Sequence, residues 1–77
     1  MSLHYYNSNA LLLVNAKGLI RVLYTPFRVL CRFDLLNIPK GTWVYVDEVF
    51  SNERDELIYQ VNGQTYSYKH FRLQISF

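Results

Sequence analysis

Apolar and polar residues alternate along much of this chain, and the alternation is clearest directly after Pro26. On one side of the extended segment lie Phe27, Val29, Cys31 and Phe33, and on the other side lie Arg28, Leu30 and Arg32. A period of two residues is typical of a half-buried β-strand. We therefore expect the first set to face the core. Pro26 also divides the apolar run Leu19–Phe33, because proline cannot donate a hydrogen bond within a central strand.

Two further segments predict strands and a hairpin. Thr42–Phe50 (TWVYVDEVF) carries the strongest strand signal in the chain. Leu57–Val61 and Gln64–Lys69 are strands joined by Asn62-Gly63, a two-residue loop that favours a type I′ turn, in which both residues need positive φ. This turn predicts the pairs Val61 with Gln64, Tyr59 with Tyr66 and Leu57 with Tyr68, all on the core face.

The register of Thr42–Phe50 depends on the polar loop Ser51–Glu56. A symmetric loop pairs Phe50 with Leu57 and Val46 with Val61. It then turns Val44, Val46 and Phe50 inward, and it turns Trp43, Tyr45, Asp47 and Val49 outward beside Ile58. This register also points Glu48 into the core, which is unfavourable for a charge. A one-residue bulge would reverse part of the assignment, and both registers stay open.

The two ends of the chain carry weaker patterns. Residues 1–9 read as a frayed arm or an added edge strand. Ala10–Val14 reads either as a short helix capped by Asn9 and ending at Gly18, or as the first of two strands, Leu11–Val14 and Leu19–Tyr24, joined by a turn at residues 15–18. We favour the strands, because the sequence after Gly18 is strand-like. The remaining segments are a loop at Asp34–Gly41, a tight turn at His70–Arg72 and a last short strand at Leu73–Phe77.

Length and composition limit the fold class. A chain of 77 residues, 51% hydrophobic and 17% aromatic, predicts one globular domain over residues 1–77 with a thin core. Its Tyr, Phe and Val content favours an all-β fold. Ala10–Val14, the longest apolar stretch, is too short to span a bilayer, and no signal-peptide pattern opens the chain. We therefore expect a cytoplasmic domain without a membrane partner. Self-association is a common source of stability at this size.

From Leu19 onward the order of elements resembles the SH3-like small β-barrel. The segment Pro39–Val46 looks like the turn and β-branched strand that open the second strand of such barrels. Asn62-Gly63 would be the distal hairpin, and residues 69–71 would form the 3₁₀ turn before the last strand. The resemblance covers residues 19–76 and implies a barrel of about five to six antiparallel strands with a short helical turn near residue 70. It implies no particular function, because such folds host many.

Few residues offer catalytic chemistry. His4, His70 and Cys31 lack the spacing of a metal site, and no cofactor motif is present. Cys31 lies in an apolar run, which favours a buried thiol over a reactive one. A hydrolase built on Cys31 and His70 is a formal alternative without local support. We therefore expect a non-enzymatic domain that binds no metal and no cofactor.

Charge and aromatic residues suggest a binding surface. Residues 1–33 contain four basic residues and no acidic residue, whereas residues 34–77 contain four basic and six acidic residues. The candidate surface consists of Trp43, Tyr45, Ile58, Arg28 and Arg32. Such residues suit an interface with a protein partner or a second copy. Alternatively, Arg21, Arg28 and Arg32 with the aromatic rings would bind single-stranded nucleic acid. A third interpretation is that the aromatic side chains fill the core.

Overall fold

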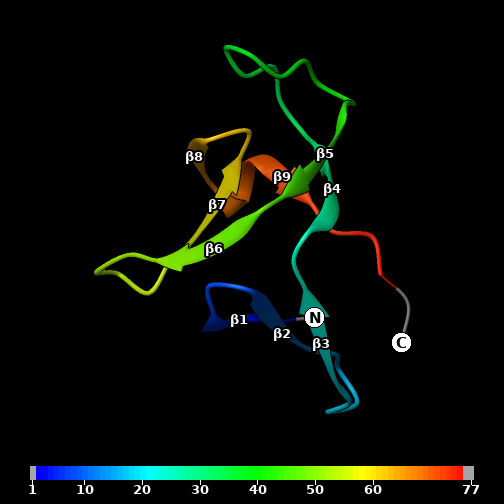
Figure 1. The fold of residues 1–77 in the computed structure, drawn as a ribbon. Helices are drawn as coiled ribbons and strands as arrows, with labels where there is room; N and C mark the ends of the chain where they lie inside the picture. Colours follow the sequence, from blue (N-terminus) through cyan, green and yellow to red (C-terminus); the bar gives the residue numbers. More distant parts are fainter. Residues whose placement is uncertain (1, 76–77) are drawn as a thin grey trace.

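The computed structural model describes residues 2–75 and confirms an all-β chain (Figure 1). Apart from the strands, these residues contain one 3₁₀ turn, η1 (Tyr68–His70), close to the expected position near residue 70. The strands are β1 (Ser2–Asn7), β2 (Ala10–Val14), β3 (Ile20–Tyr24), β4 (Phe27–Cys31), β5 (Trp43–Val46), β6 (Glu48–Ser51), β7 (Leu57–Val61), β8 (Gln64–Ser67) and β9 (Phe71–Arg72). Seven of them, β3 to β9, follow residue 19, where five to six were expected, because the predicted strand Thr42–Phe50 is divided into β5 and β6.

The strands form three antiparallel sheets, in the orders β1-β2-β3, β5-β4-β9 and β6-β7-β8. The division between β5 and β6 falls at Asp47, where the chain leaves β4 and joins β7. The Asp47 N–H donates to the Gln60 carbonyl oxygen at 2.8 Å, so the pairing with β7 begins at that residue. Within residues 2–75 the three hydrogen-bonded ladders do not close into one sheet. The SH3-like barrel therefore stays a prediction.

The hairpin between β7 and β8 has the predicted turn and register. Asn62 and Gly63 both have positive φ, 51° and 79°. Val61 pairs with Gln64, and Tyr59 pairs with Tyr66. The third predicted pair, Leu57 with Tyr68, does not form, because β8 ends at Ser67 and the Ser67 hydroxyl accepts a hydrogen bond from the Lys69 N–H at the start of η1.

The N-terminal region is a three-stranded sheet, which confirms the strand interpretation of Ala10–Val14 over the helical one. Asn15 makes the turn between β2 and β3, since its side-chain oxygen accepts hydrogen bonds from the Lys17 and Leu19 N–H groups at 3.0 and 2.9 Å. Gly18 completes the turn with a φ of 81°. Ser2–Asn7 forms an edge strand rather than a frayed arm.

The loop before β7 resolves the register that the sequence left open. Asn52 closes a tight loop, because its side-chain oxygen accepts hydrogen bonds from the Arg54 and Glu56 N–H groups, both at 2.9 Å. As a result Ser51 pairs with Leu57 and Phe50 pairs with Ile58. The symmetric register is wrong by one position.

This shift reverses the faces of β6 relative to the symmetric register. Val49 is fully buried, whereas Glu48 and Phe50 are exposed. The expected inward positions of Glu48 and Phe50 and the expected outward position of Val49 are therefore wrong. In β5 the assignment holds, with Val46 buried and Trp43 and Tyr45 exposed. The change of face between β5 and β6 occurs where the chain passes from one sheet to the next, as the bulge alternative implied.

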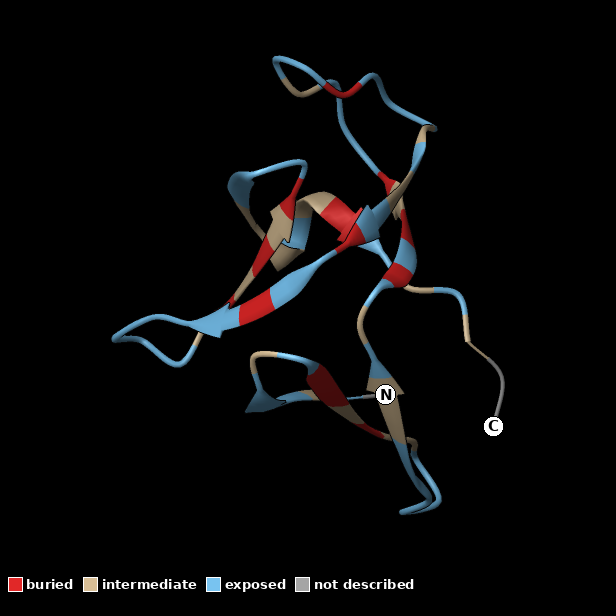
Figure 2. Cartoon of the chain, in the orientation of Figure 1, coloured by how far each residue is buried: buried red, intermediate tan, exposed pale blue. Residues whose placement is uncertain are grey.

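One hydrophobic core cluster collects side chains from all three sheets (Figure 2). Its buried members are Leu11, Leu13, Phe27, Val29, Cys31, Ile38, Val46, Val49, Leu57, Tyr59, Val61 and Phe71. The alternation in β4 is confirmed for Phe27, Val29 and Cys31 but not for Phe33, which is 50% exposed. Phe33 lies beyond the end of β4, where the chain has entered the loop at residues 33–41. Ile38 supplies a buried apolar side chain from that loop.

The end of the chain differs from the prediction. The expected turn at His70–Arg72 is displaced, since η1 ends at His70 and Phe71–Arg72 already form β9. β9 pairs with β4 through Arg72 with Leu30 and Phe71 with Cys31. Of the expected strand Leu73–Phe77, residues 73–75 are not in a strand, and residues 76 and 77 lie outside the described residues. No helix in the described part of the chain is long and apolar enough to cross a membrane.

Candidate functional site

The outer face of the β5-β4-β9 sheet carries most of the candidate residues. Directly paired residues of antiparallel strands project from the same side of the sheet. Trp43, Leu30 and Arg72 therefore form one row across the three strands, and Tyr45 and Arg28 form the adjacent row. The opposite side of β4 holds Val29 and is buried. The alternation in the sequence thus separates a core face from an outward face.

A cation–π contact organises the centre of this face. The Cζ atom of Arg28 lies 4.4 Å from the centroid of the Trp43 ring. Trp43 is 39% exposed and Tyr45 is 60% exposed, so both rings keep surface that a ligand can reach. A guanidinium group stacked on an indole ring keeps its charge beside a flat apolar surface. Such a pair can bind planar groups and anionic groups together.

Further basic side chains surround this centre. A shallow hollow beside it is lined by Leu30, Arg32, Lys40 and Arg72. Together with Arg28, Trp43 and Tyr45, these residues make up what we call the basic face. In residues 2–75 no carboxylate forms an ion pair with the basic side chains of this face; Glu56 pairs with Lys69, outside it, at 3.5 Å. The carboxylate of Asp34 accepts the backbone N–H of Lys40 at 2.8 Å.

The structure brings together four of the five residues predicted for the site. Trp43, Tyr45 and Arg28 lie on paired strands, and Arg32 follows at the end of β4, with its guanidinium Cζ 5.3 Å from the Phe33 ring centroid. Ile58 does not join them. It pairs with Phe50 in the β6-β7-β8 sheet, whereas Trp43 and Tyr45 lie on β5 in the β5-β4-β9 sheet.

Sequence reasoning missed Leu30, Lys40 and Arg72 as members of this surface. Leu30 was expected on the outward face of its strand but was not assigned a role. Lys40 belongs to the loop before β5. Arg72 belongs to β9, which begins at Phe71, two residues before the start predicted at Leu73. Arg72 could have been found only from the pairing of Phe71–Arg72 with β4. This pairing links positions about 40 residues apart in the sequence.

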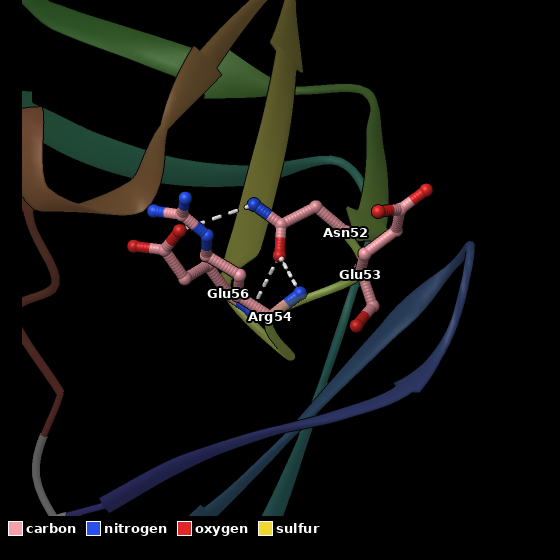
Figure 3. Close-up of a pocket in the computed structure, with 5 residues that line it drawn as sticks. Asn52, Glu53, Arg54 and Glu56 are labelled. Carbon is pink, nitrogen blue, oxygen red and sulfur yellow. Dashed lines mark hydrogen bonds between the residues drawn. The ribbon is translucent and has the colours of Figure 1, made fainter.

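A second hollow lies at the loop between β6 and β7, lined by Ser51, Asn52, Glu53, Arg54 and Glu56 (Figure 3). Asn52 makes most of the hydrogen bonds in this loop. Its side-chain oxygen accepts from the backbone N–H groups of Arg54 and Glu56, and its amide nitrogen donates to the Glu56 carboxylate at 3.2 Å. The hydrogen bond from Asn52, followed by the one from Lys69, lowers the pKa of Glu56 below its ordinary value of 4.5. These polar groups bind one another, which is how a self-contained loop is built.

The lowered pKa of Glu56 predicts an acid-dependent loss of stability. A carboxyl group with a lower pKa in the folded state stabilises the fold above its unfolded pKa and loses that effect as pH falls through the folded pKa. We expect Glu56→Gln to lower the melting temperature at neutral pH and to match the wild type in acid well below pH 4.5. Thermal denaturation followed by circular dichroism at several pH values measures the difference.

The control for this prediction is Glu53→Gln, in the same loop. Glu53 makes neither the hydrogen bond to Asn52 nor the contact with Lys69 that Glu56 makes. The effect of Glu53→Gln on the melting temperature should therefore not change with pH as the effect of Glu56→Gln does. A Glu56→Gln effect that persists unchanged in acid would show that the carboxylate charge is not the cause.

The cysteine and the histidines occupy ordinary structural positions. The Cys31 thiol is buried and donates to the carbonyl oxygen of Phe33 at 3.0 Å. The His70 ring packs edge-on against Phe33, with centroids 6.3 Å apart, and His4 contacts the Ser2 hydroxyl. Among residues 2–75 no three His, Cys, Asp or Glu side chains gather in a way that could hold a metal ion. The thiol and the imidazole thus both lie beside Phe33, the thiol on its carbonyl oxygen and the imidazole on its ring.

Comparisons with known proteins identify no relative of this chain. No protein family, curated protein or solved structure matches the chain.

Proposed function

We propose that this chain is a non-enzymatic binding domain whose basic face binds single-stranded nucleic acid. The observation that carries the proposal is the Arg28 guanidinium 4.4 Å from the Trp43 ring, beside the exposed ring of Tyr45. Proteins that bind single strands without sequence preference combine aromatic rings, on which bases stack, with basic side chains along the phosphates.

The charge distribution supports an anionic ligand. Arg28, Arg32, Lys40 and Arg72 lie on one face without ion-pair partners among the described residues, although the net charge of the whole chain is only +2. Unpaired cations on one side of a protein attract polyanions more strongly than the net charge suggests. Ile58 is not part of the proposed surface, because it lies opposite Phe50.

The proposal predicts salt-dependent binding of oligonucleotides. A fluorescein-labelled oligothymidylate of about ten nucleotides should bind at low salt, and a Trp43→Ala variant should bind it roughly tenfold more weakly, since one stacked base contributes about 1–3 kcal/mol. With four phosphate contacts, the logarithm of the affinity should fall against that of the salt concentration with a slope of about −3, and Arg72→Gln should reduce that slope by about 0.7. Fluorescence anisotropy titrations measure both quantities.

A matched control is Arg54→Gln, which removes the same charge from the loop between β6 and β7. Arg54 lies in that loop, and the loop projects away from β4, β5 and β9 (Figure 1), so its replacement should leave the salt slope nearly unchanged. The absence of oligonucleotide binding at low salt would contradict the proposal. Equal losses in Arg54→Gln and Arg72→Gln would contradict the assignment of the surface.

A second function, as a protein-interaction domain, is favoured by exposed apolar side chains outside the basic face. Ile20 and Tyr24 on β3 are 64% and 66% exposed, and Leu36 is 97% exposed. Aromatic residues and arginine are also enriched where proteins meet. A protein partner or a second copy of the chain would use these side chains together with Trp43 and Tyr45. Sedimentation at increasing protein concentration tests the self-association directly.

We also propose that the chain is a divergent member of the SH3-like small barrels. Support comes from the order of elements: a bent strand shared by two sheets at Asp47, the Asn62-Gly63 hairpin, and the 3₁₀ turn Tyr68–His70 directly before a short last strand.

A further inference from the structure

A groove opens beside the basic face, between the edge strand β3 and the segment that follows β9. It is lined by residues 21–24 of β3, by residues 73–75, and by Phe27, Arg28 and Trp43. Its volume is about 530 Å³. Pockets of 300–1,000 Å³ are the size that small organic ligands occupy. The groove is therefore large enough for one nucleotide.

The lining of the groove combines a cationic, an aromatic and an amide surface. Arg28 contributes positive charge, Tyr24 and Trp43 contribute rings, and Gln74 contributes a side chain that can both donate and accept hydrogen bonds. No carboxylate belongs to the described residues that line it. A ligand with a flat ring and a negative charge matches this lining, because the ring can stack on the aromatic side chains and the charge can lie near the guanidinium.

The groove is also continuous with the basic face. Arg28 and Trp43 belong to both, and the stacked pair that they form lies at the boundary between them. On the other side of Trp43 lies its neighbour Leu30, which lines the hollow with Arg32, Lys40 and Arg72. A linear polyanion bound along the cations from Lys40 to Arg28 would therefore place one of its ends in the groove.

We propose that the groove is a nucleotide subsite that receives one nucleotide at the end of a single strand bound on the basic face. The inference rests on the proposed function, which supplies the rest of the strand. In this subsite Tyr24 and Trp43 stack with the base, and Arg28 lies near the phosphate. Tyr24 is 66% exposed at the end of β3, so its ring is accessible from the groove side of the sheet.

The test is a series of oligothymidylates of increasing length, from about two to ten nucleotides. The wild type should gain affinity until the strand fills both the face and the groove. Tyr24→Ala should lose roughly tenfold in affinity for the long strands, because one stacked base is lost. It should bind the shortest strands, which fit on the basic face alone, as well as the wild type does. The matched control is Tyr6→Ala, since Tyr6 is 58% exposed on β1 and does not line the groove.

A second measurement locates the nucleotide without relying on a variant. In NMR titrations with the oligothymidylate of about ten nucleotides, the backbone signals of Tyr24, Leu73 and Gln74 should shift together with the indole signal of Trp43. Two results together would overturn the subsite and leave the proposed function standing. Tyr24→Ala would bind long strands as tightly as the wild type does, and the NMR shifts would be confined to the basic face. An absence of binding by every oligonucleotide would overturn both. Shifts of the same groove signals on addition of an acidic peptide, but not on addition of the oligonucleotide, would identify a peptide site and overturn the proposal.

Discussion

A Val49→Asp variant is expected to lose its fold, whereas Phe50→Asp is expected to remain folded. Val49 is fully buried, and Phe50 is 37% exposed on the opposite face of β6. Burying a carboxylate without a partner costs several kcal/mol, or forces the group to take up a proton. At about 0.05–0.15 kcal/mol per residue, a domain of this size has only about 4–12 kcal/mol of stability in total. The single substitution at Val49 thus removes most or all of it.

Phe50→Asp is the matched control, because it introduces the same carboxylate on the opposite face of β6. Phe50→Asp loses part of an apolar contact with Ile58 and some strand preference, together about 1–2 kcal/mol. Urea denaturation followed by tryptophan fluorescence compares the two variants, with Trp43 as the probe. If Phe50→Asp unfolds the chain and Val49→Asp does not, the faces of β6 are the reverse of those in the structure, and the symmetric register holds.

The second large effect is expected at Tyr59, the largest fully buried side chain among residues 2–75. Its ring packs edge-on against Phe27, with centroids 5.7 Å apart, and at a tilt against Phe71, at 6.0 Å. These three rings come from two different sheets. Replacing a buried aromatic residue with alanine costs about 3–5 kcal/mol. In a domain of this size each kcal/mol lowers the melting temperature by about 4–8 °C, so Tyr59→Ala should melt at least ~12 °C below the wild type.

The conservative variant Tyr59→Phe separates packing from the hydroxyl group. Burial raises the pKa of Tyr59, which indicates that its hydroxyl group stays neutral inside the protein. Tyr59→Phe keeps the ring and should change the stability by about 1 kcal/mol or less. A loss as large in Tyr59→Phe as in Tyr59→Ala would assign the stability to the hydroxyl group and contradict the packing argument. Thermal and urea denaturation of both variants decides between them.

Local signals in the sequence predicted the elements whose geometry depends on neighbouring residues. The Asn62-Gly63 turn and the register of its hairpin were predicted correctly, because positive φ at both positions is a property of the turn itself. The alternation after Pro26 was predicted correctly as far as Cys31, because a strand alternates between its two faces. The same alternation identified Arg28 and Arg32 as outward residues of the candidate site.

The tertiary structure decided where the strands end and which faces meet. Phe33 continues the alternation but lies beyond the end of β4, and the chain after Val46 moves to another sheet. A side-chain hydrogen bond at Asn52 shortened the next loop, moved Phe50 opposite Ile58 and buried Val49. Each of these steps depends on the partner strand, and alternation within one segment carries no information about that partner.

The candidate site, like the fold, was predicted only in part from the sequence. The sequence by itself determined an all-β chain with Arg28 on an outward face, because this position follows from strand alternation, and it left open which face of the Trp43 and Tyr45 strand is outward. Only the tertiary structure brought Arg72 beside Leu30 and separated Ile58 from Trp43. The reason is physical: pairing between distant strands is set by the fit of the whole core, and that fit decides which surface residues become neighbours.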